Sequence, residues 1–429
     1  MSFLLFLPLL QEAAPSPTSP WTDRERKILL SLSPLPPVPA SPGNEVADDP
    51  VAAALGRALF FDPGLSGDDS MSCATCHDPD KGWGDGLARA KGRKELAFHT
   101  PSVVGAAFNR WQFWDGRKDS LWSQALEPIE HPDEMAGSRT GVLHHIRRTP
   151  PLLELWGAAF GPFPDLTDPD RFPESACPAP VDPASPFEDL SGASPDSRHR
   201  AWAEMKADDQ AVVDANYAKV GKAIGAFERL LVSGLSPFDR WVEGLEDDRE
   251  SLVEGFGATQ WRGARLFIGK AGCLQCHFGP GFTDGQFHNV GMAVPAGTDF
   301  DDGRPLGIQR VRVDRFNARG KHSARPGVRK NPHLLYLAFD EHTYGAYKTP
   351  TLRNLGRTAP FGHDGRFATL MEVLDFYEDL PGLPPIGHRE ETLLPLELST
   401  SEKEDLVAFL HSLTSEPIAK EFGRPSRKP

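Results

Sequence analysis

The strings CATCH, at residues 73–77, and CLQCH, at residues 273–277, decide how this sequence is interpreted. Each string has the pattern Cys-x-x-Cys-His, which occurs in zinc sites, redox dithiols, disulfides and sites of covalent haem attachment. Four of the five cysteines of the chain lie in these two strings. The chemistry of the molecule is therefore expected to centre on them.

Zinc and dithiol chemistry each leave part of the pattern unexplained. A structural zinc ion binds four nitrogen or sulfur ligands. The two strings could supply four thiolates only by leaving both histidines idle, and they lie in opposite halves of the chain, far beyond zinc-ribbon spacing. A thioredoxin-type dithiol occurs beside a βαβ unit, and no such pattern surrounds either string.

Covalently bound haem accounts for every residue of both strings. The two thiols of such a string bond to the haem vinyl groups, and the histidine that follows can ligate the iron. The sequence therefore predicts two haem c groups, with His77 and His277 as their proximal iron ligands. The attaching residues are Cys73 and Cys76 in the first string and Cys273 and Cys276 in the second.

Composition limits the classes of partner. The chain has 429 residues, of which 39% are hydrophobic, enough for two domains with separate cores. Its formal net charge is −14, and no run rich in Lys or Arg stands out. Nucleic acid is therefore not expected as a partner, because phosphate contacts need clustered cations.

The N-terminus predicts export. The apolar run MSFLLFLPLL is shorter than the ~20 residues that span a bilayer, so residues 1–20 are predicted to be a signal peptide. A Pro-rich leader is expected at 21–45. The mature protein is expected in the periplasm, with no membrane span.

Two haem domains are predicted to follow. The N-terminal domain is placed at 46–245 and the C-terminal domain at 250–413, with a tail at 414–429. The stretch 161–211 is rich in Pro, Asp and Ser and is predicted to be a surface insertion. It holds the remaining cysteine, Cys177, which is expected to be a free thiol.

Helices dominate the predicted fold. Ser120 can cap a helix that Pro128 ends. Residues 214–233 form a second helix with one apolar face, and residues 400–413 form a third, capped one. Little reads as β-structure, so the fold class is mostly α, with two cytochrome c-like domains packed together. The apolar face comprises Tyr217, Val220, Ile224, Phe227 and Leu231.

Several segments resemble the bacterial dihaem cytochrome c peroxidases and the related MauG-type enzymes of methylamine utilisation. Together they cover most of residues 50–413 apart from the insertion. The resemblance implies that the N-terminal haem binds peroxide and the C-terminal haem handles electrons. The segments are FWDGR (113–117), Glu134–Met135, GPGFTDGQFHNVGM (279–292), KTPTLRNLGRTAPFGHDGR (348–366) and the C-terminal helix.

Three residues take roles in peroxide chemistry through this resemblance. Glu134 and Gln124 match residues of the peroxide pocket, and Trp114 matches a tryptophan between the haems. A carboxylate over the iron can shuttle a proton as the O–O bond breaks, and an amide can orient peroxide without titrating. The structural alternatives are a solvated acid for Glu134, a satisfied helix amide for Gln124 and a core residue for Trp114.

Two positions depart from the typical peroxidases. Many of them carry a distal histidine on a mobile loop, where this chain has Lys91, which implies a site that needs no reductive activation. His99 takes the place of an asparagine that helps to bind a calcium ion between the domains. The other calcium ligands implied are the backbone carbonyls of Thr358 and Pro360.

The resemblance also identifies an axial ligand for the second haem. That position is Met in typical peroxidases, Tyr in MauG-type enzymes and Tyr377 here. Helical spacing puts Tyr377 on the face of Leu370 and Leu374, so a packed ring is the structural alternative. Met371, a rival ligand, lies roughly 120° away around the helix, and Met292 is a second rival. An anionic oxygen ligand favours ferric iron.

Three functions are consistent with these residues. The leading one is reduction of H2O2 with electrons from a small cytochrome c or cupredoxin. The second is MauG-like oxidation of residues of a partner protein, which a His/Tyr haem would favour. The third, from another class, is a dihaem electron carrier or sensor without turnover.

Overall fold

A computed structural model of the chain describes residues 21–180, 194, 196–246, 253–292, 302–338 and 340–424. The sheet in this part consists of β1 (Phe287–His288) paired antiparallel with β2 (Tyr347–Lys348). Helices and long loops make up the rest, which confirms the mostly α prediction. None of the described helices is long and apolar enough to cross a membrane. The predicted signal at 1–20 lies outside the described residues.

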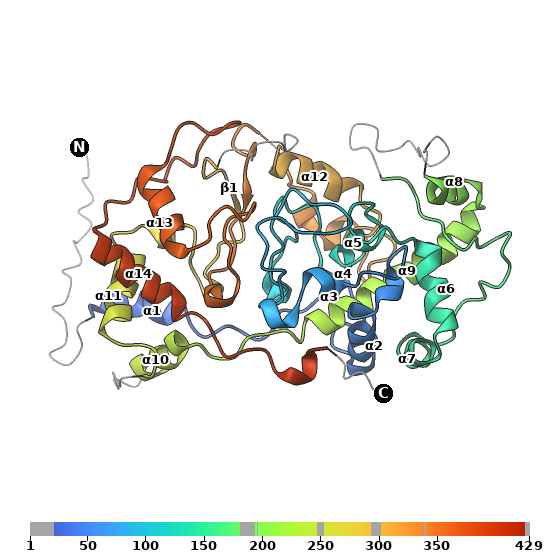
Figure 1. Cartoon of the computed structure of the whole chain (residues 1–429), viewed down its shortest axis with the longest axis horizontal. Coiled ribbons are helices and arrows are strands. Elements are labelled where there is room, and N and C mark those ends of the chain that lie inside the picture. Colours follow the sequence, from blue (N-terminus) through green and yellow to red (C-terminus); the bar gives the residue numbers. More distant parts are fainter. Residues whose placement is uncertain are drawn as a thin grey trace, which may run out of the picture.

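One hydrophobic cluster forms around α2 (Pro50–Phe60) and α9 (Ala207–Glu228), on the right in Figure 1. The two helices touch closely, because a Cβ on Gly56 would lie 1.8 Å from the Ala223 carbonyl oxygen. All five residues of the predicted apolar face of α9 and its extension are at most 1% exposed. Further helices contribute to this cluster, among them α4 (Leu121–Gln124), α6 (Arg139–Arg148) and α7 (Pro150–Phe160).

A second cluster forms around α11 (Ala258–Ile268) and α14 (Thr400–His411) at the other end of the long axis (Figure 1). A Cβ on Gly263 would lie 2.1 Å from the Asp405 carbonyl oxygen, so these helices also touch. The capping box of α14 between Ser399 and Glu402 confirms the predicted capped helix. The cluster also includes residues of α1 (Asp23–Ser31), α10 (Pro237–Glu246) and α13 (Leu370–Asp379).

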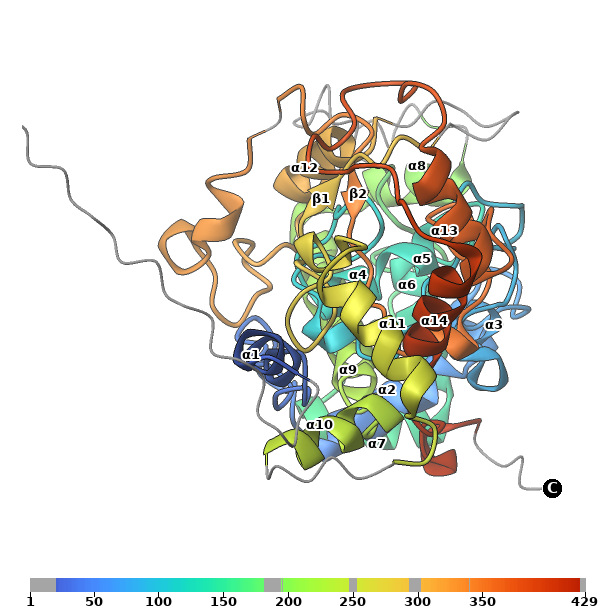
Figure 2. The same ribbon diagram turned by 90° about the vertical axis from the view of Figure 1, so that its left-hand side faces the viewer.

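Each end of the described chain packs against the cluster that is formed mainly by the other half of the sequence. Helix α1 lies in the predicted leader but packs beside α10 and α11 in the second cluster (Figure 2). Near the C-terminus, Ile418 and Phe422 pack against the first cluster. The domain limits at about 245 and 250 stay a prediction. Helix α10 lies on the N-terminal side of these limits in sequence and contributes to the second core.

Two local expectations need correction. Ser120 caps α4 as predicted, but Pro128 does not end that helix. It lies in the first turn of α5 (Glu127–Glu130), where its missing N–H costs nothing. The predicted surface insertion is partly core, because Leu166, Phe172 and Trp202 are at most 2% exposed. The remaining helices are α3 (Cys73–Cys76), α8 (Ser197–Glu204) and α12 (Arg304–Val313).

Candidate functional site

The first Cys-x-x-Cys-His string forms one tight helical turn. Residues Cys73–Cys76 are α3, and the backbone N–H of His77 donates to the Cys73 carbonyl at 2.9 Å. The turn brings both thiols and the imidazole to one place. The His77 Nδ1 atom lies 3.2 Å from the carbonyl oxygen of Trp83, whose backbone adopts a positive φ of 63°.

The second string repeats this geometry. Residues Cys273–Gln275 form a 3-10 turn, and the His277 N–H donates to the Cys273 carbonyl at 2.9 Å. The His277 Nδ1 atom lies 2.9 Å from the carbonyl oxygen of Phe282, which also has a positive φ, of 50°. Two regions far apart in sequence thus form the same local structure.

The donor atoms of both strings fit covalent haem. A carbonyl can only accept, so each Nδ1 carries the proton and each Nε2 keeps a free lone pair, the arrangement usual for a metal-ligating histidine. Each ring also lies close to a second backbone carbonyl, that of Pro101 for His77 and that of Pro350 for His277. Burial lowers the pKa of His77 and of His277, which keeps both rings neutral. The four thiols are free rather than paired in disulfides.

The correspondence extends to the loop that follows each string. FWDGR (113–117) and GHDGR (362–366) each begin at a positive φ and have a glycine at positive φ in the fourth position. Each loop is closed by an antiparallel bridge, Gln112 with Lys118 and Phe361 with Phe367. Trp114 in the first loop and His363 in the second occupy the same place.

Trp114 is bonded to both halves of the molecule. Its indole Nε1 donates to the His99 carbonyl at 3.0 Å, and its own carbonyl accepts from the Lys348 N–H at 2.8 Å. The indole lies edge-on to the His363 ring, with 6.4 Å between centroids. The His363 ring in turn stacks on Tyr347 at 4.0 Å. The structure therefore places Trp114 between the two regions, inside a continuous group of rings.

Glu134 lies in the N-terminal region and is held by backbone pairing. The N–H groups of Arg93 and Lys94 donate to the carbonyls of Glu134 and Asp133, at 3.3 and 3.1 Å. The Glu134 side chain is 19% exposed. Burial raises its pKa to about 7, and the opposing charge of Arg117 limits that rise. The carboxyl can therefore take up and release a proton near neutral pH.

Gln124 and Arg117 belong to neighbouring elements. Gln124 is the last residue of α4, is half-buried, and its side-chain amide has no hydrogen-bond partner among the described residues. Arg117 donates to Glu127 at 2.6 Å, and its guanidinium lies 3.5 Å from the centroid of the Phe113 ring. The pairing with Arg117 and Lys118 holds the pKa of Glu127 well below its usual range. Glu127 is therefore charged, whereas Glu134 sits at its midpoint near neutrality.

The loop beside Glu134 carries no histidine. Lys91 is exposed, and residues 86–98 contain no histidine. On the Glu134 side, the Nδ1 atom of His131 lies 3.9 Å from the Glu134 carboxyl. The nearby His99 is 8% exposed, and its Nδ1 lies 2.7 Å from the Leu87 carbonyl oxygen. Its ring nitrogen is thus engaged within this loop.

The predicted calcium ligands, Thr358 and Pro360, lie outside the group with metal-ligand geometry found among the described residues. Thr358 and Pro360 follow the 3-10 turn Leu355–Arg357. Among the described residues, the group with metal-ligand geometry is Cys276, Asp284 and His288, beside the second haem string. Calcium at Thr358 and Pro360 therefore stays a prediction.

Tyr377 lies on α13 beside the second anchor. Burial and then the nearby thiols of Cys273 and Cys276 raise its pKa to about 12. Its hydroxyl has no hydrogen-bond partner among the described residues. The rival Met292 lies at the His363 turn, because a Cβ on Gly362 would meet the Met292 methyl at 2.8 Å.

Sequence reasoning missed several residues around these sites. They include the carbonyls of Trp83 and Phe282 and the half-buried Lys348, whose pKa is lowered to about 8 by loss of solvent around its amine. A signal was present: GWGDG (82–86) and GFTDG (281–285) follow the two strings at nearly the same distance. Aligning the two halves with each other would have found both carbonyls.

Comparisons with known proteins agree with this geometry. A family profile described as di-haem cytochrome c peroxidase matches residues 50–247. The methylamine utilization protein MauG of Methylorubrum extorquens is 36% identical over 376 residues, which cover 86% of this chain and 80% of that protein. The cytochrome-c peroxidase IdrP2 of Pseudomonas sp. strain SCT is 31% identical over 404 residues, 94% of this chain and 90% of that one.

A solved structure shares the fold. It is that of a MauG-like protein associated with microbial copper homeostasis, with a TM-score of 0.61 and 23% identity. The match covers 92% of this chain and 99% of that one. At this identity the likeness concerns the arrangement of the helices.

Proposed function

The chain belongs to the di-haem cytochrome c peroxidase family, and from this membership we propose that it reduces hydrogen peroxide with electrons from a small redox protein. The observation that carries the proposal is Glu134, a carboxyl with a pKa of about 7 that lies beside the histidine-free loop 86–98 and 3.9 Å from the Nδ1 atom of His131. A proton shuttle is needed where peroxide is cleaved, and not where electrons merely pass.

Two haem c groups would be held by the two strings. Cys73 and Cys76 would carry the first and His77 its iron, while Cys273, Cys276 and His277 would do the same for the second. Bound haem supplies a redox-active iron whose potential depends on its axial ligands. The backbone carbonyls of Trp83 and Phe282 would fix the orientation of the two imidazoles.

Glu134 and Gln124 would handle the protons and the position of peroxide. The ionised Glu134 carboxylate would accept the proton of one peroxide oxygen and return it to the other as water leaves. The Gln124 amide, which has no partner among the described residues, would donate a hydrogen bond that orients the peroxide. Both side chains would act without first displacing a histidine.

Trp114 would connect the two regions. Its indole bonds the His99 carbonyl of one half and packs against the His363 ring of the other. A fixed aromatic ring in that position would carry electrons between the regions.

A second function is favoured by Tyr377. Its phenol lies near Cys273 and Cys276, which matches an oxygen ligand on the second haem. An oxygen ligand favours oxidised iron, so that region would accept electrons poorly from a small cytochrome. We therefore also propose that the protein oxidises residues of a partner protein, as an alternative to rapid turnover with a cytochrome.

The two functions separate in one experiment. Peroxide is added to the fully oxidised holoprotein, and oxidation of a reduced small cytochrome c is followed. Rapid oxidation without prior reduction supports the peroxidase. A long-lived state that is more oxidised than the starting ferric protein, with little cytochrome oxidation, supports the partner-protein reaction. No reaction with peroxide contradicts both and indicates a carrier or sensor.

Location and calcium complete the proposal. Attachment of haem c and the predicted signal at 1–20 favour a periplasmic protein. A calcium ion would bind the carbonyls of Thr358 and Pro360, beside the contact between the halves. Elemental analysis before and after treatment with a chelator tests this: one calcium per chain is expected, and none contradicts it.

A further inference from the structure

The segment after α12 is the most basic part of an acidic chain. Residues 315–339 contain none of the 60 Asp and Glu residues, although the formal net charge is −14. The cations are spread along the segment rather than consecutive, so they form no basic run in the sequence. They are Arg315, Arg319, Lys321, Arg325, Arg329 and Lys330.

The fold gathers these cations on one loop. The Asn331 amide donates to the carbonyls of Ala318, Arg325 and Gly327, at 2.7, 2.9 and 3.1 Å. The Gly327 N–H donates to the Arg319 carbonyl at 3.1 Å. Asn331 is 7% exposed, so it ties the loop together from inside. Figure 2 shows this segment, in orange, projecting from the side of the molecule.

Most of these charges are not neutralised. Arg315 pairs with Asp214 at 2.9 Å. The other five cations form no ion pair with any residue that the structure describes, and Lys321, Arg325, Arg329 and Lys330 are exposed. The acids that flank the segment are Asp314, which is bound to Lys118 at 3.0 Å, and the exposed Asp340, which accepts a hydrogen bond from the His342 N–H at 3.0 Å.

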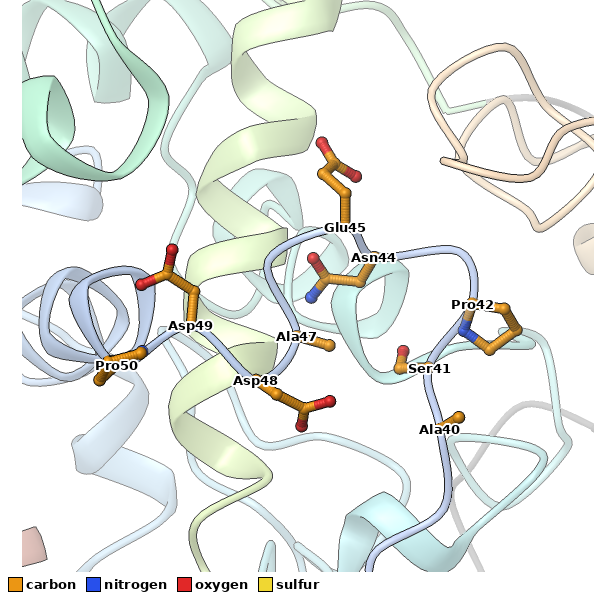
Figure 3. A pocket seen from close by; sticks show the side chains of 9 residues that line it. All are labelled: Ala40, Ser41, Pro42, Asn44, Glu45, Ala47, Asp48, Asp49 and Pro50. Atoms are coloured by element: carbon orange, nitrogen blue, oxygen red, sulfur yellow. The ribbon is translucent and has the colours of Figure 1, made fainter.

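An acidic segment lies next to the loop but is already paired. The Ala324 N–H donates to the Gly43 carbonyl at 3.0 Å, which brings the segment 40–50 alongside. That segment lines a pocket of about 520 Å³ (Figure 3). Two of its acids pair with cations at α9 and its C-terminus: Glu45 bonds Lys222 at 2.5 Å and Asp48 bonds Arg229 at 2.6 Å. Its third acid, Asp49, caps α2. They leave the basic loop uncompensated.

An apolar tip adjoins the cations. Leu335 is 44% exposed and Tyr336 is 83% exposed, although Leu334 before them is buried. Tyrosine and arginine side chains are enriched at protein interfaces. The ring of His333 lies 5.7 Å from that of Trp111, which is three residues before Trp114 in the sequence. The surface thus lies over the segment that carries the tryptophan between the two regions.

We propose that the loop 319–336 is a docking surface for a small acidic redox protein. The inference rests on the proposed function and names the class of partner. Local positive charge attracts an acidic partner and orients it during encounter, while Leu335 and Tyr336 supply the desolvated contact. A nucleic acid would use the cations but would leave the two apolar side chains exposed.

Binding without electron transfer tests the surface. The probe is an acidic cupredoxin carrying redox-inert Zn²⁺, and its affinity for the haem-loaded full chain is measured between 20 and 200 mM salt. Wild type is expected to lose about tenfold or more in affinity over this range. The variant Lys321→Glu/Arg325→Glu/Arg329→Glu/Lys330→Glu is expected to bind about tenfold more weakly or worse at low salt. Leu335→Ser/Tyr336→Ser should weaken binding with little change in its salt dependence.

A matched control changes the same total charge elsewhere. The variant Arg24→Glu/Lys27→Glu/Lys206→Glu/Lys420→Glu reverses four exposed cations outside the loop and is expected to bind the probe within about threefold of wild type. Equal losses in both charge variants would overturn the proposal, as would stronger binding of a short DNA duplex than of the cupredoxin. Because the probe carries no electrons, its failure to bind would contradict the surface and leave peroxide reduction with a small-molecule donor as a separate result.

Discussion

The two haem-binding regions share their scaffold and differ in what surrounds it. Both contain a Cys-x-x-Cys-His turn, a histidine held by a positive-φ carbonyl, and a DGR loop closed by a bridge. The N-terminal region adds Glu134, with a pKa near neutrality, and an unpartnered Gln124 amide. The C-terminal region adds Tyr377 beside its two thiols. The two regions therefore share their local backbone arrangement and differ in a few side chains around it.

The largest effect is expected from Glu134→Gln. This variant keeps the shape of the side chain but cannot accept a proton, so peroxide reduction should fall by about 10²–10⁴-fold. Stopped-flow reaction of the oxidised holoprotein with peroxide measures it. Asp133→Asn, which changes the neighbouring half-buried acid that pairs with Lys94, should stay within about threefold of wild type. Retained activity in the Glu134 variant would show that this carboxyl is not what distinguishes the N-terminal region from the C-terminal one.

The same residue predicts a pH profile. The raised pKa means that Glu134 is protonated and unable to accept a proton well below pH 7. The peroxide rate constant should therefore increase with pH, reach half its plateau at about 7 and level off above it. Glu134→Gln should lose this rise, while Tyr377→Met should keep it. A profile shared by both variants would assign the titration to another group.

Tyr377→Met tests the other region. Replacing an oxygen ligand with a thioether should raise the reduction potential of the second haem, by roughly 100 mV or more, since axial ligands set potentials over a wide range. Spectroelectrochemistry of the holoprotein measures this shift. Met371→Leu should leave the potential unchanged. If instead Met371→Leu alters the spectrum and the Tyr377 variant does not, the axial assignment is wrong.

Trp114→Phe tests the connection between the regions. Removing the indole takes away the bond to the His99 carbonyl and the more easily oxidised ring. Electron transfer between the regions should slow by about tenfold, equivalent to about 1.4 kcal/mol in the barrier. Trp111→Phe in the same loop is the control, and a similar slowing there would show that the effect is structural.

The smallest effects are expected at two matching helix caps. Ser120 caps the helix that ends at Gln124, and Thr369 caps the helix that carries Tyr377. Replacing either with Ala should cost about 1 kcal/mol of unfolding free energy, measured by denaturant titration. Ser120→Ala should also change peroxide kinetics, and Thr369→Ala the potential of the second haem. If Ser120→Ala changed the potential of the second haem, or Thr369→Ala changed the peroxide kinetics, the two regions would not act separately.

The sequence identified the two Cys-x-x-Cys-His turns directly because they are local in sequence. Five consecutive residues supply both thiols and the imidazole, and the buried face of α9 follows from helical spacing alone. Other features depended on contacts across the chain. The leader could not be seen to pack against the C-terminal core, since Trp21 and Leu29 are buried by residues more than 200 positions away.

The candidate site was reached mainly through resemblance. Nothing in the local sequence distinguishes Glu134 from Asp133. The difference arises from the burial of Glu134 and from the contact of Asp133 with Lys94, which is distant in sequence. The positive-φ backbone at Trp83 and Phe282 was also hidden, because neither residue type favours that conformation. Only the comparison of the two halves would have marked these positions.

The spectrum of the fully oxidised holoprotein tests the central claim most directly. Electron paramagnetic resonance, combined with a cyanide titration, reports whether one haem or both have an open coordination position. The account predicts one high-spin haem that takes up one equivalent of cyanide, and one low-spin haem that Tyr377→Met alters. Two low-spin haems in wild type, with no cyanide uptake, would contradict an open peroxide site in the N-terminal region.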